Sequence, residues 1–255
     1  MAPDPSQWRS STSYDYFDDL GVSDLAWECL RRNADYQQDY ARALSKMDDP
    51  EQATSSFRLR WGLQFPRRST PQRDRRADPL DHDGRSRKGP VDRHARHWLG
   101  RSTTPALDPS AARRSTHELH AIQGDGGSAV PYVLIGDAAP DQPLAAVIPL
   151  DTDAPDRLDA VSRLLSALTT PPPPADLRVT SQRRRRLRHM LQAFDGRASR
   201  ATYREIAEVM FGASRVASDA WKTSPLRDAT VRLVRDGLAM VNGGYRDLLR
   251  RRRRR

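Results

Sequence analysis

Arginine side chains gathered in the last third of the sequence have the chemistry to bind phosphate and to read guanine. The 255 residues carry a net charge of +10, and because Lys46, Lys88 and Lys222 are the only lysines, 40 of the 43 basic residues are arginine. The planar guanidinium group offers five donors, which match phosphate oxygens and the edge of guanine. Residues 176–255 hold 21 basic and 8 acidic residues. This excess favours double-stranded DNA as the partner.

A helix that begins after Ser224 is expected to present several of these groups. Ser224 is a favourable N-cap, and the proline that follows it suits the first helical position. With about 100° between successive residues, the apolar side chains cover one side of this helix. Asp228, Arg232 and Arg235 share the opposite side, and Arg227 lies at its margin. The outer surface is therefore predicted to be polar and mainly cationic.

Two preceding helices are expected to support that helix. The first carries an apolar stripe between Leu187 and Phe194, and the second spans 203–211. Thr202 and Glu205 form a capping box before the second helix, and Gly212 stands where a C-cap is expected. Two helices, a turn and a basic helix are typical of helix-turn-helix DNA readers. The connection over 213–223 is longer than usual, which predicts a variant of this motif.

We therefore predict a DNA-binding surface and no catalytic residue. The arginines in the first turns of the first helix are unfavourable next to the positive end of the helix dipole, and a nearby anion such as a DNA phosphate would offset this cost. The alternative is that these arginines form a solvated charged face without a ligand. Arg227 could bind guanine with two hydrogen bonds, whereas Asp228 could accept from cytosine or orient an arginine. The candidate DNA-binding residues are Arg183, Arg184, Arg186, Lys222, Thr223, Ser224, Arg227, Asp228, Arg232, Arg235 and Arg246.

The sequence ends with six consecutive arginines, Arg250 to Arg255. Six neutralised phosphates would add a salt-sensitive contribution to affinity that does not depend on the DNA sequence. The alternative is a disordered tail without a function. Both interpretations place these residues in a C-terminal DNA-binding domain over residues 180–255.

The fold is expected to be mainly α-helical and divided by linkers, because only 37% of the residues are hydrophobic and 19 are proline. Residues 1–66 are predicted to form a small, acidic, aromatic-rich helical domain in which Ser23 caps a helix. Residues 67–128 form an Arg/Pro-rich linker that is expected to be disordered. Order is expected to return in residues 129–170.

That central segment is expected to contain a short β-hairpin and a helix. Two apolar runs, 130–135 and 144–148, predict the strands of the hairpin. The spacing of leucines and valine predicts a helix over 156–168. A proline spacer at 171–179 then separates this segment from the helix-turn-helix domain.

Other classes of site are not favoured by the sequence. His117 and His120 are not followed by a third ligand at a usual interval, so no metal is predicted, and no cofactor motif is present. Cys29 is the only cysteine, which excludes an internal disulfide. No catalytic motif is found, so we predict that the protein is not an enzyme. The first residues do not read as a secretory signal and no apolar run could span a bilayer, which predicts a cytoplasmic, nucleoid-associated protein without a membrane partner.

The C-terminal sequence resembles a proteobacterial variant helix-turn-helix domain family that was long listed as of unknown function. The resemblance covers roughly residues 144–250 and rests on Pro149–Asp151, Arg183–Leu187, Tyr203–Ala207, Phe211–Gly212, Trp221–Arg227, Arg232–Gly237 and Gly243–Leu249. A short domain that accompanies it in activator members is similar to Leu25–Glu28, Leu30–Asn33, Tyr36, Trp61–Leu63 and Phe65–Pro66. No family pattern is found over 67–120.

This resemblance implies a regulator encoded on an integrative and conjugative element. Members are implied to be either transcriptional activators of excision and transfer genes or small antiactivators that bind those activators. The presence of both domains favours an activator that binds promoter DNA, with RNA polymerase and a small antiactivator as possible protein partners. The alternative is an interaction protein that binds a related regulator through its helix-turn-helix domain. The density of positive charge favours DNA, because protein interfaces tend to deplete charge at their centres.

Overall fold

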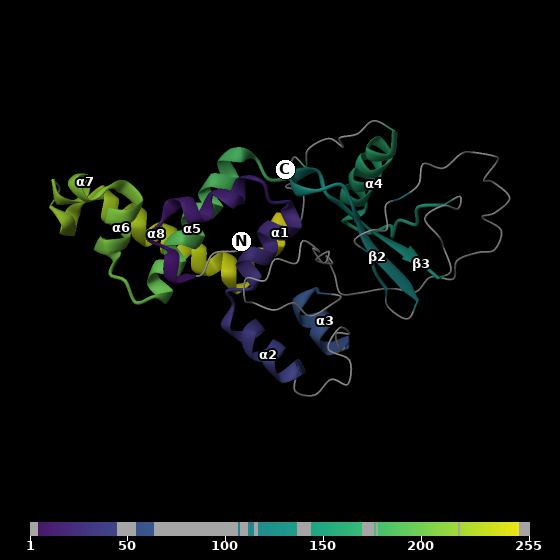
Figure 1. The fold of residues 1–255 in the computed structure, drawn as a ribbon, viewed down its shortest axis with the longest axis horizontal. Helices are drawn as coiled ribbons and strands as arrows, with labels where there is room; N and C mark the ends of the chain where they lie inside the picture. Colours follow the sequence, from purple (N-terminus) through teal and green to yellow (C-terminus); the bar gives the residue numbers. More distant parts are fainter. Residues whose placement is uncertain are drawn as a thin grey trace. The chain divides into compact units, whose positions relative to one another are not determined.

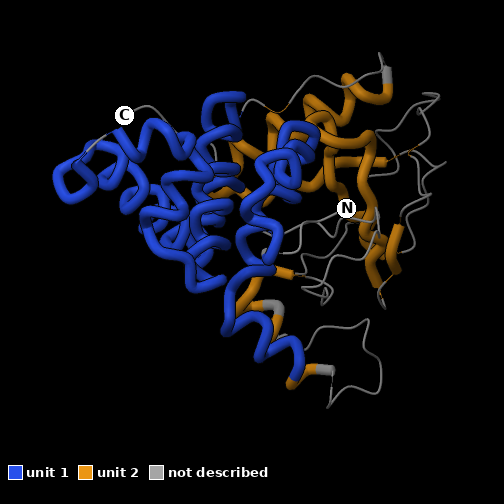
Figure 2. Tube along the Cα trace, turned by 60° about the vertical axis from the view of Figure 1, so that its left-hand side comes forward, with its two compact units in different colours: residues 1–41, 67–75, 177–249 blue, residues 42–66, 76–176, 250–255 orange. Residues whose placement is uncertain are grey.

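The computed structural model divides the chain into two compact units. It describes residues 5–44, 55–63, 107, 112–114, 117–136, 144–169, 176, 178–218 and 220–249. The first unit comprises residues 1–41, 67–75 and 177–249, and the second comprises residues 42–66, 76–176 and 250–255 (Figure 2). Segments from early and late in the chain therefore share the first unit. The prolines at 171–174 and the arginines at 250–255 lie outside the described residues.

Helices make up the described part of the first unit (Figure 1). The early segment contains η1 (Pro5–Gln7), η2 (Ser11–Asp18), α1 (Val22–Leu30) and the start of α2 (Ala34–Leu44). The late segment contains α5 (Ser181–Ala198), α6 (Tyr203–Phe211), α7 (Ala213–Ala217), η5 (Trp221–Thr223), α8 (Pro225–Ala239), η6 (Met240–Gly244) and α9 (Arg246–Leu249). The predicted mainly α-helical class is confirmed.

The predicted caps of α6 and the predicted N-cap of α8 are confirmed. Thr202 Oγ1 accepts a hydrogen bond from the backbone N–H of Glu205, and the Glu205 carboxylate accepts one from the backbone N–H of Thr202. Gly212 ends α6 with a φ of 96°, a conformation that glycine adopts without a steric cost. Ser224 Oγ accepts from the N–H of Leu226 and so caps α8. These local hydrogen bonds fix where the two helices of the motif begin.

The predicted N-cap of α1 is wrong. Gly21 is the N-cap, and its carbonyl accepts a hydrogen bond from the N–H of Leu25 at 3.0 Å. Ser23 therefore lies inside the first turn. The helix starts earlier because Val22 is buried at 4% exposure and joins the apolar side of α1, which a cap at Ser23 would have left outside the helix. Cys29 is fully buried on that side.

The early and late segments share one apolar core. Trp8 packs with Ala193 of α5, Ile206 of α6 and Val234 of α8. A Cβ added to Gly196 would lie 3.1 Å from the Trp8 ring, so the indole sits directly on α5. The first residues of the predicted separate N-terminal domain are thus an integral part of the helical unit that carries α6 and α8.

A buried charge cluster also joins the two segments. Arg32 donates two hydrogen bonds of 2.8 Å to the Asp195 carboxylate of α5, and the Tyr14 hydroxyl donates to the same carboxylate at 2.6 Å. The side chains of Arg32 and Asp195 are 2% and 1% exposed. Glu28 forms ion pairs with Arg31 and Arg32. Although burial opposes ionisation, the two guanidiniums lower the pKa of Glu28. Each buried charge therefore has an opposite charge in contact with it.

The second unit contains a small antiparallel sheet and a helix that packs on it. β1 (Arg113–Arg114), β2 (Glu118–Gln123) and β3 (Val130–Ile135) lie in the order β1-β2-β3. α4 (Ala154–Thr169) contributes Leu164 and Leu168 to a core around Tyr132 and Leu134 of β3. The described part of this unit also contains α3 (Ser55–Trp61), the short helix η4 (Gly126–Ser128) and the end of α2. The predicted strand at 130–135 and the predicted helix after it are confirmed.

The predicted partner of β3 is wrong. β3 pairs with β2, in the register Glu118 with Ile135 and Gln123 with Val130. Residues 144–150 form no regular secondary structure, and Val147 is 75% exposed. The prediction chose 144–148 because this run is apolar. The actual partner, β2, includes polar residues and is held by backbone hydrogen bonds, so its composition did not mark it as a strand. Residues 117–128, which were predicted to be the last part of the disordered linker, instead contain β2 and a short helical turn. Residues 67–106 lie outside the described residues.

Candidate nucleic-acid interface

The exposed side of α8 carries charged side chains in its first three turns. Arg227, Asp228, Arg232 and Arg235 are exposed, whereas Thr230 is buried on the opposite side. Arg227 Nη1 lies 3.5 Å from Asp228 Oδ1, and the Arg227 side chain is 46% exposed. This loose contact leaves the guanidinium of Arg227 accessible. Such an arrangement can read the edge of a base.

A glycine on α8 allows this helix to pack closely against α5. A Cβ added to Gly237 would lie only 2.4 Å from the carbonyl oxygen of Met190, which belongs to the backbone of α5. Glycine is therefore required where the two helices approach each other. The short distance between α5 and α8 therefore depends on the absence of a side chain at Gly237.

The arginines of α5 divide between two faces of the helix. Arg184 donates to the carbonyl oxygens of Phe17 and Leu20 in the early segment. Arg188 donates to the carbonyl of Ser11 at 2.8 Å and pairs with Asp15 at 2.5 Å. These arginines stabilise the junction between the segments. Arg185 and Arg186 lie on the other face and are exposed.

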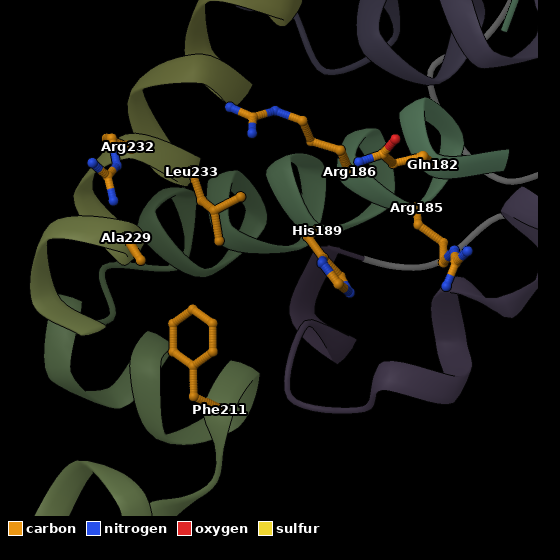
Figure 3. A pocket seen from close by; sticks show the side chains of 8 residues that line it. All are labelled: Gln182, Arg185, Arg186, His189, Phe211, Ala229, Arg232 and Leu233. Carbon is orange, nitrogen blue, oxygen red and sulfur yellow. The ribbon is translucent and has the colours of Figure 1, made fainter. Parts of the chain in front are cut away.

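A groove of about 750 Å³ lies beside this second face of α5 (Figure 3). α5 supplies one wall, α8 supplies the other, and Phe211 from the end of α6 adds an aromatic surface. No acidic side chain is among the lining residues, which are Gln182, Arg185, Arg186, His189, Phe211, Ala229, Arg232 and Leu233. The groove is therefore cationic with an apolar portion.

One carboxylate links the two helices next to the groove. Asp236 of α8 accepts from Arg186 at 2.7 Å and from Arg235 at 3.0 Å. Although burial opposes ionisation, the hydrogen bonds from Arg235 and Arg186 lower the pKa of Asp236. The ionised carboxylate holds both guanidiniums near the exposed side of α8. Because Arg186 and Arg235 are 62% and 70% exposed, both can still contact an external anion.

Lowering the pH from 7 to 5 is expected to destabilise the wild-type protein more than the His189→Gln variant. Burial, together with Arg188 and Arg185, lowers the pKa of His189 from 6.5. The unfolded chain therefore binds this proton more readily than the folded protein. The resulting contribution to stability is complete above the unfolded pKa and is lost as the pH falls through the folded pKa. Urea unfolding at several pH values measures the difference. His117→Gln, at an exposed position of the second unit, should behave like wild type, and identical pH profiles for all three proteins would contradict the prediction.

The other candidate residues take different positions. Ser224 is 3% exposed and its hydroxyl caps α8, so it serves the fold rather than the surface. Arg183 is half-buried and donates to the carbonyl of Arg178 at 3.3 Å. Lys222 and Thr223 are exposed on η5 directly before α8. Arg246 lies on α9, with its guanidinium 5.3 Å from the Tyr245 ring centre. Arg184 points away from the groove into the junction described above.

Sequence reasoning missed the contribution of Arg185 and His189. Their spacing contained the signal, because Gln182, Arg185, Arg186 and His189 recur at i, i+3, i+4 and i+7 and so share one helix face. The apolar stripe of α5 was recognised by the same rule. What the spacing could not show is that α8 forms a second wall opposite this polar stripe.

Two parts of the chain match known protein families. Residues 147–250 match a family described as "T6SS, Transcription factor, DNA binding domain". Residues 7–66 match a family described as "Proteobacterial transcriptional regulator-like domain". No curated protein matches the chain. α5, α6 and α8 all fall within the first match, and the early segment from Gln7 onward falls within the second.

Together, the two matches and the basic surface support a DNA-binding transcriptional regulator. Both families are of the regulator or DNA-binding type rather than enzymes. Among the described residues, no group of three or more His, Cys, Asp or Glu side chains could hold a metal ion. None of the described helices is both long and apolar enough to cross a membrane.

Proposed function

We propose that the protein is a sequence-specific activator that inserts α8 into the major groove of promoter DNA. The target genes proposed from the sequence are the excision and transfer genes of an integrative and conjugative element. RNA polymerase and a small antiactivator protein are the proposed protein partners. The helix-turn-helix spacing of α6 and α8 and the regulator-like early segment support this function.

The exposed charged face of α8 is the observation that carries the proposal. The N-terminal residues of a recognition helix contact base edges, and here Arg227 and Asp228 stand one turn after the cap. Arg232 and Arg235 continue the same face toward the C-terminal half of the helix. Lys222 and Thr223 extend the polar surface to the turn before α8. A phosphate backbone would supply the anions that this cationic surface attracts.

Arg227→Ala is expected to weaken binding to a cognate site by about 1 to 3 kcal/mol and to relax the preference at one base pair. The reason is the loss of a bidentate hydrogen bond to guanine. Competitive binding against a library of single-base variants of the site measures both effects. Deletion of Arg250 to Arg255 is the matched comparison, because it should weaken cognate and random DNA about equally. If both changes act identically on cognate and random duplexes, α8 does not read bases through Arg227.

Footprinting on the upstream regions of neighbouring genes tests the proposed targets. Protection of promoters of excision or transfer genes at two salt concentrations supports the proposed role. The description of the matched DNA-binding family names T6SS instead. Protection confined to T6SS promoters would keep the DNA-binding function and replace the proposed target genes.

A further inference from the structure

Two guanidiniums in the groove between α5 and α8 have no partner within the described part of the protein. Arg185 and Arg232 line opposite walls of the groove and form no ion pair or hydrogen bond with another described residue. Arg184 and Arg188, on the other face of α5, donate hydrogen bonds to backbone carbonyls of the early segment. The structure thus separates arginines that stabilise the fold from arginines that face outward. An external anion would satisfy the second group.

Cationic side chains lie on both of the helices that form the groove. On α5, Gln182, Arg185 and His189 lie on one face over two turns (Figure 3). On α8, Arg232 lies one turn after Ala229. The cations of the lining are Arg185 and Arg186 on α5 and Arg232 on α8, and cations on both walls suit a polyanion better than a single compact anion, because several negative charges can be neutralised at once.

The apolar part of the groove adds a second requirement for the occupant. Phe211, Ala229 and Leu233 contribute carbon surface between the cationic walls. A free phosphate ion would contact the guanidiniums and leave this surface uncovered. A sugar-phosphate chain offers both phosphate oxygens and the carbon atoms of deoxyribose. Its chemistry matches both parts of the lining.

We propose that the groove between α5 and α8 holds the sugar-phosphate backbone of one DNA strand while α8 contacts the bases. The inference rests on the proposed DNA-binding function and deepens it, because it assigns Arg185 and the polar stripe of α5 to the interface. Arg232 connects the two contacts, since it lies on the exposed face of α8 and also lines the groove. The DNA-binding surface therefore extends from α8 across to α5.

The test is the salt dependence of DNA binding by the full chain with Arg185→Ala. Loss of one phosphate contact should reduce the slope of log affinity against log salt by about 0.9. Between 50 and 200 mM salt, the advantage of wild type over the variant should therefore shrink by a factor of about 3 to 4. The loss should be equal for cognate and random duplexes. Arg185 is chosen because Arg186 also pairs with Asp236.

Two matched variants control for charge and folding. Arg185→Lys keeps the positive charge and should retain the wild-type slope. Arg42→Ala removes one exposed arginine from the end of α2 and should also leave the slope unchanged. Urea unfolding of each variant confirms that the fold is intact. If Arg185→Ala unfolds, Arg185→Gln replaces it with a side chain that keeps most of the carbon stem.

Inorganic phosphate serves as the probe for a free anion. If phosphate binds wild type but not Arg185→Ala, and the DNA salt slope is the same for both, the groove is a site for a free anion and the proposal is overturned. An unchanged slope without phosphate binding also overturns it. In either case a normal specificity change in Arg227→Ala leaves the proposed function intact. If wild type does not bind any duplex, the proposed function itself fails.

Discussion

Asp195→Ala is expected to lower the free energy of unfolding of the first unit by about 3 to 5 kcal/mol. The substitution removes the acceptor of the Tyr14 hydroxyl and one of the two carboxylates that pair with Arg32, which keeps its ion pair with Glu28. Without Asp195, the two buried guanidiniums of Arg31 and Arg32 share the single carboxylate of Glu28, so one buried positive charge is not balanced, which is costly because little solvent reaches the cluster. Burial and the Asp195 carboxylate also raise the pKa of Tyr14, so the phenol remains protonated and needs an acceptor. Urea unfolding followed by tryptophan fluorescence measures the change.

Asp228→Ala is the matched control for this substitution. Asp228 is also an aspartate on a helix of the first unit, but its side chain is 67% exposed and its contact with Arg227 is loose. Its replacement should change the unfolding free energy by less than about 0.5 kcal/mol. A similarly small effect for Asp195→Ala would show that the buried cluster does not hold the early segment against α5. If Asp195→Ala cannot be purified, Asp195→Asn replaces it. The asparagine keeps one acceptor oxygen, so a smaller decrease in the free energy of unfolding is expected, which urea unfolding can still measure.

Gly237→Val is expected to destabilise the protein by about 3 kcal/mol and to weaken binding to all duplexes. Overpacking of this kind typically costs about 1 to 3 kcal/mol, and the nearest atom here belongs to the rigid backbone of α5. The helices must move apart to admit the side chain. Since α5 and α8 form the walls of the groove, the same movement separates Arg185 from Arg232. Unfolding and DNA titration on the same sample test both consequences.

Gly127→Ala controls for the removal of glycine itself. Nothing lies within 4 Å of a Cβ added there, so a small change in stability is expected. Normal DNA affinity in a folded Gly237→Val protein would contradict the link between helix spacing and binding. A variant that loses affinity while keeping most of its stability would support that link most directly.

Local signals in the sequence predicted the helices of the motif well. The capping box at Thr202 and Glu205 and the cap at Ser224 rest on residues at most three apart. Such contacts depend on side-chain chemistry and spacing alone. The partner of β3 was missed because strand pairing depends on residues that composition does not mark. The core shared by Trp8 and Val234 was also missed, since no local pattern connects residues so distant in the chain.

The candidate interface was predicted only in part for the same reason. The exposed face of α8 follows from helical periodicity, and the structure places Arg227, Asp228, Arg232 and Arg235 there. Helical spacing places neighbouring arginines of α5 on different faces, but it does not show which face meets the early segment. Arg184 and Arg185 are adjacent and identical in type, yet one donates to backbone carbonyls and the other faces the groove. The position of the early segment decides which of the two it engages.

The shared core has a consequence for how the protein is made. Arg32 leaves the ribosome 163 residues before Asp195, and Tyr14 leaves it 181 residues before the same carboxylate. During that interval the aromatic side chains of the early segment are without the helices that cover them, and closing so long a loop slows folding. Translation that stops before α5 therefore yields a chain with neither the covering helices nor α8. The complete DNA-binding unit is therefore formed late in synthesis, after both of its halves exist on one polypeptide.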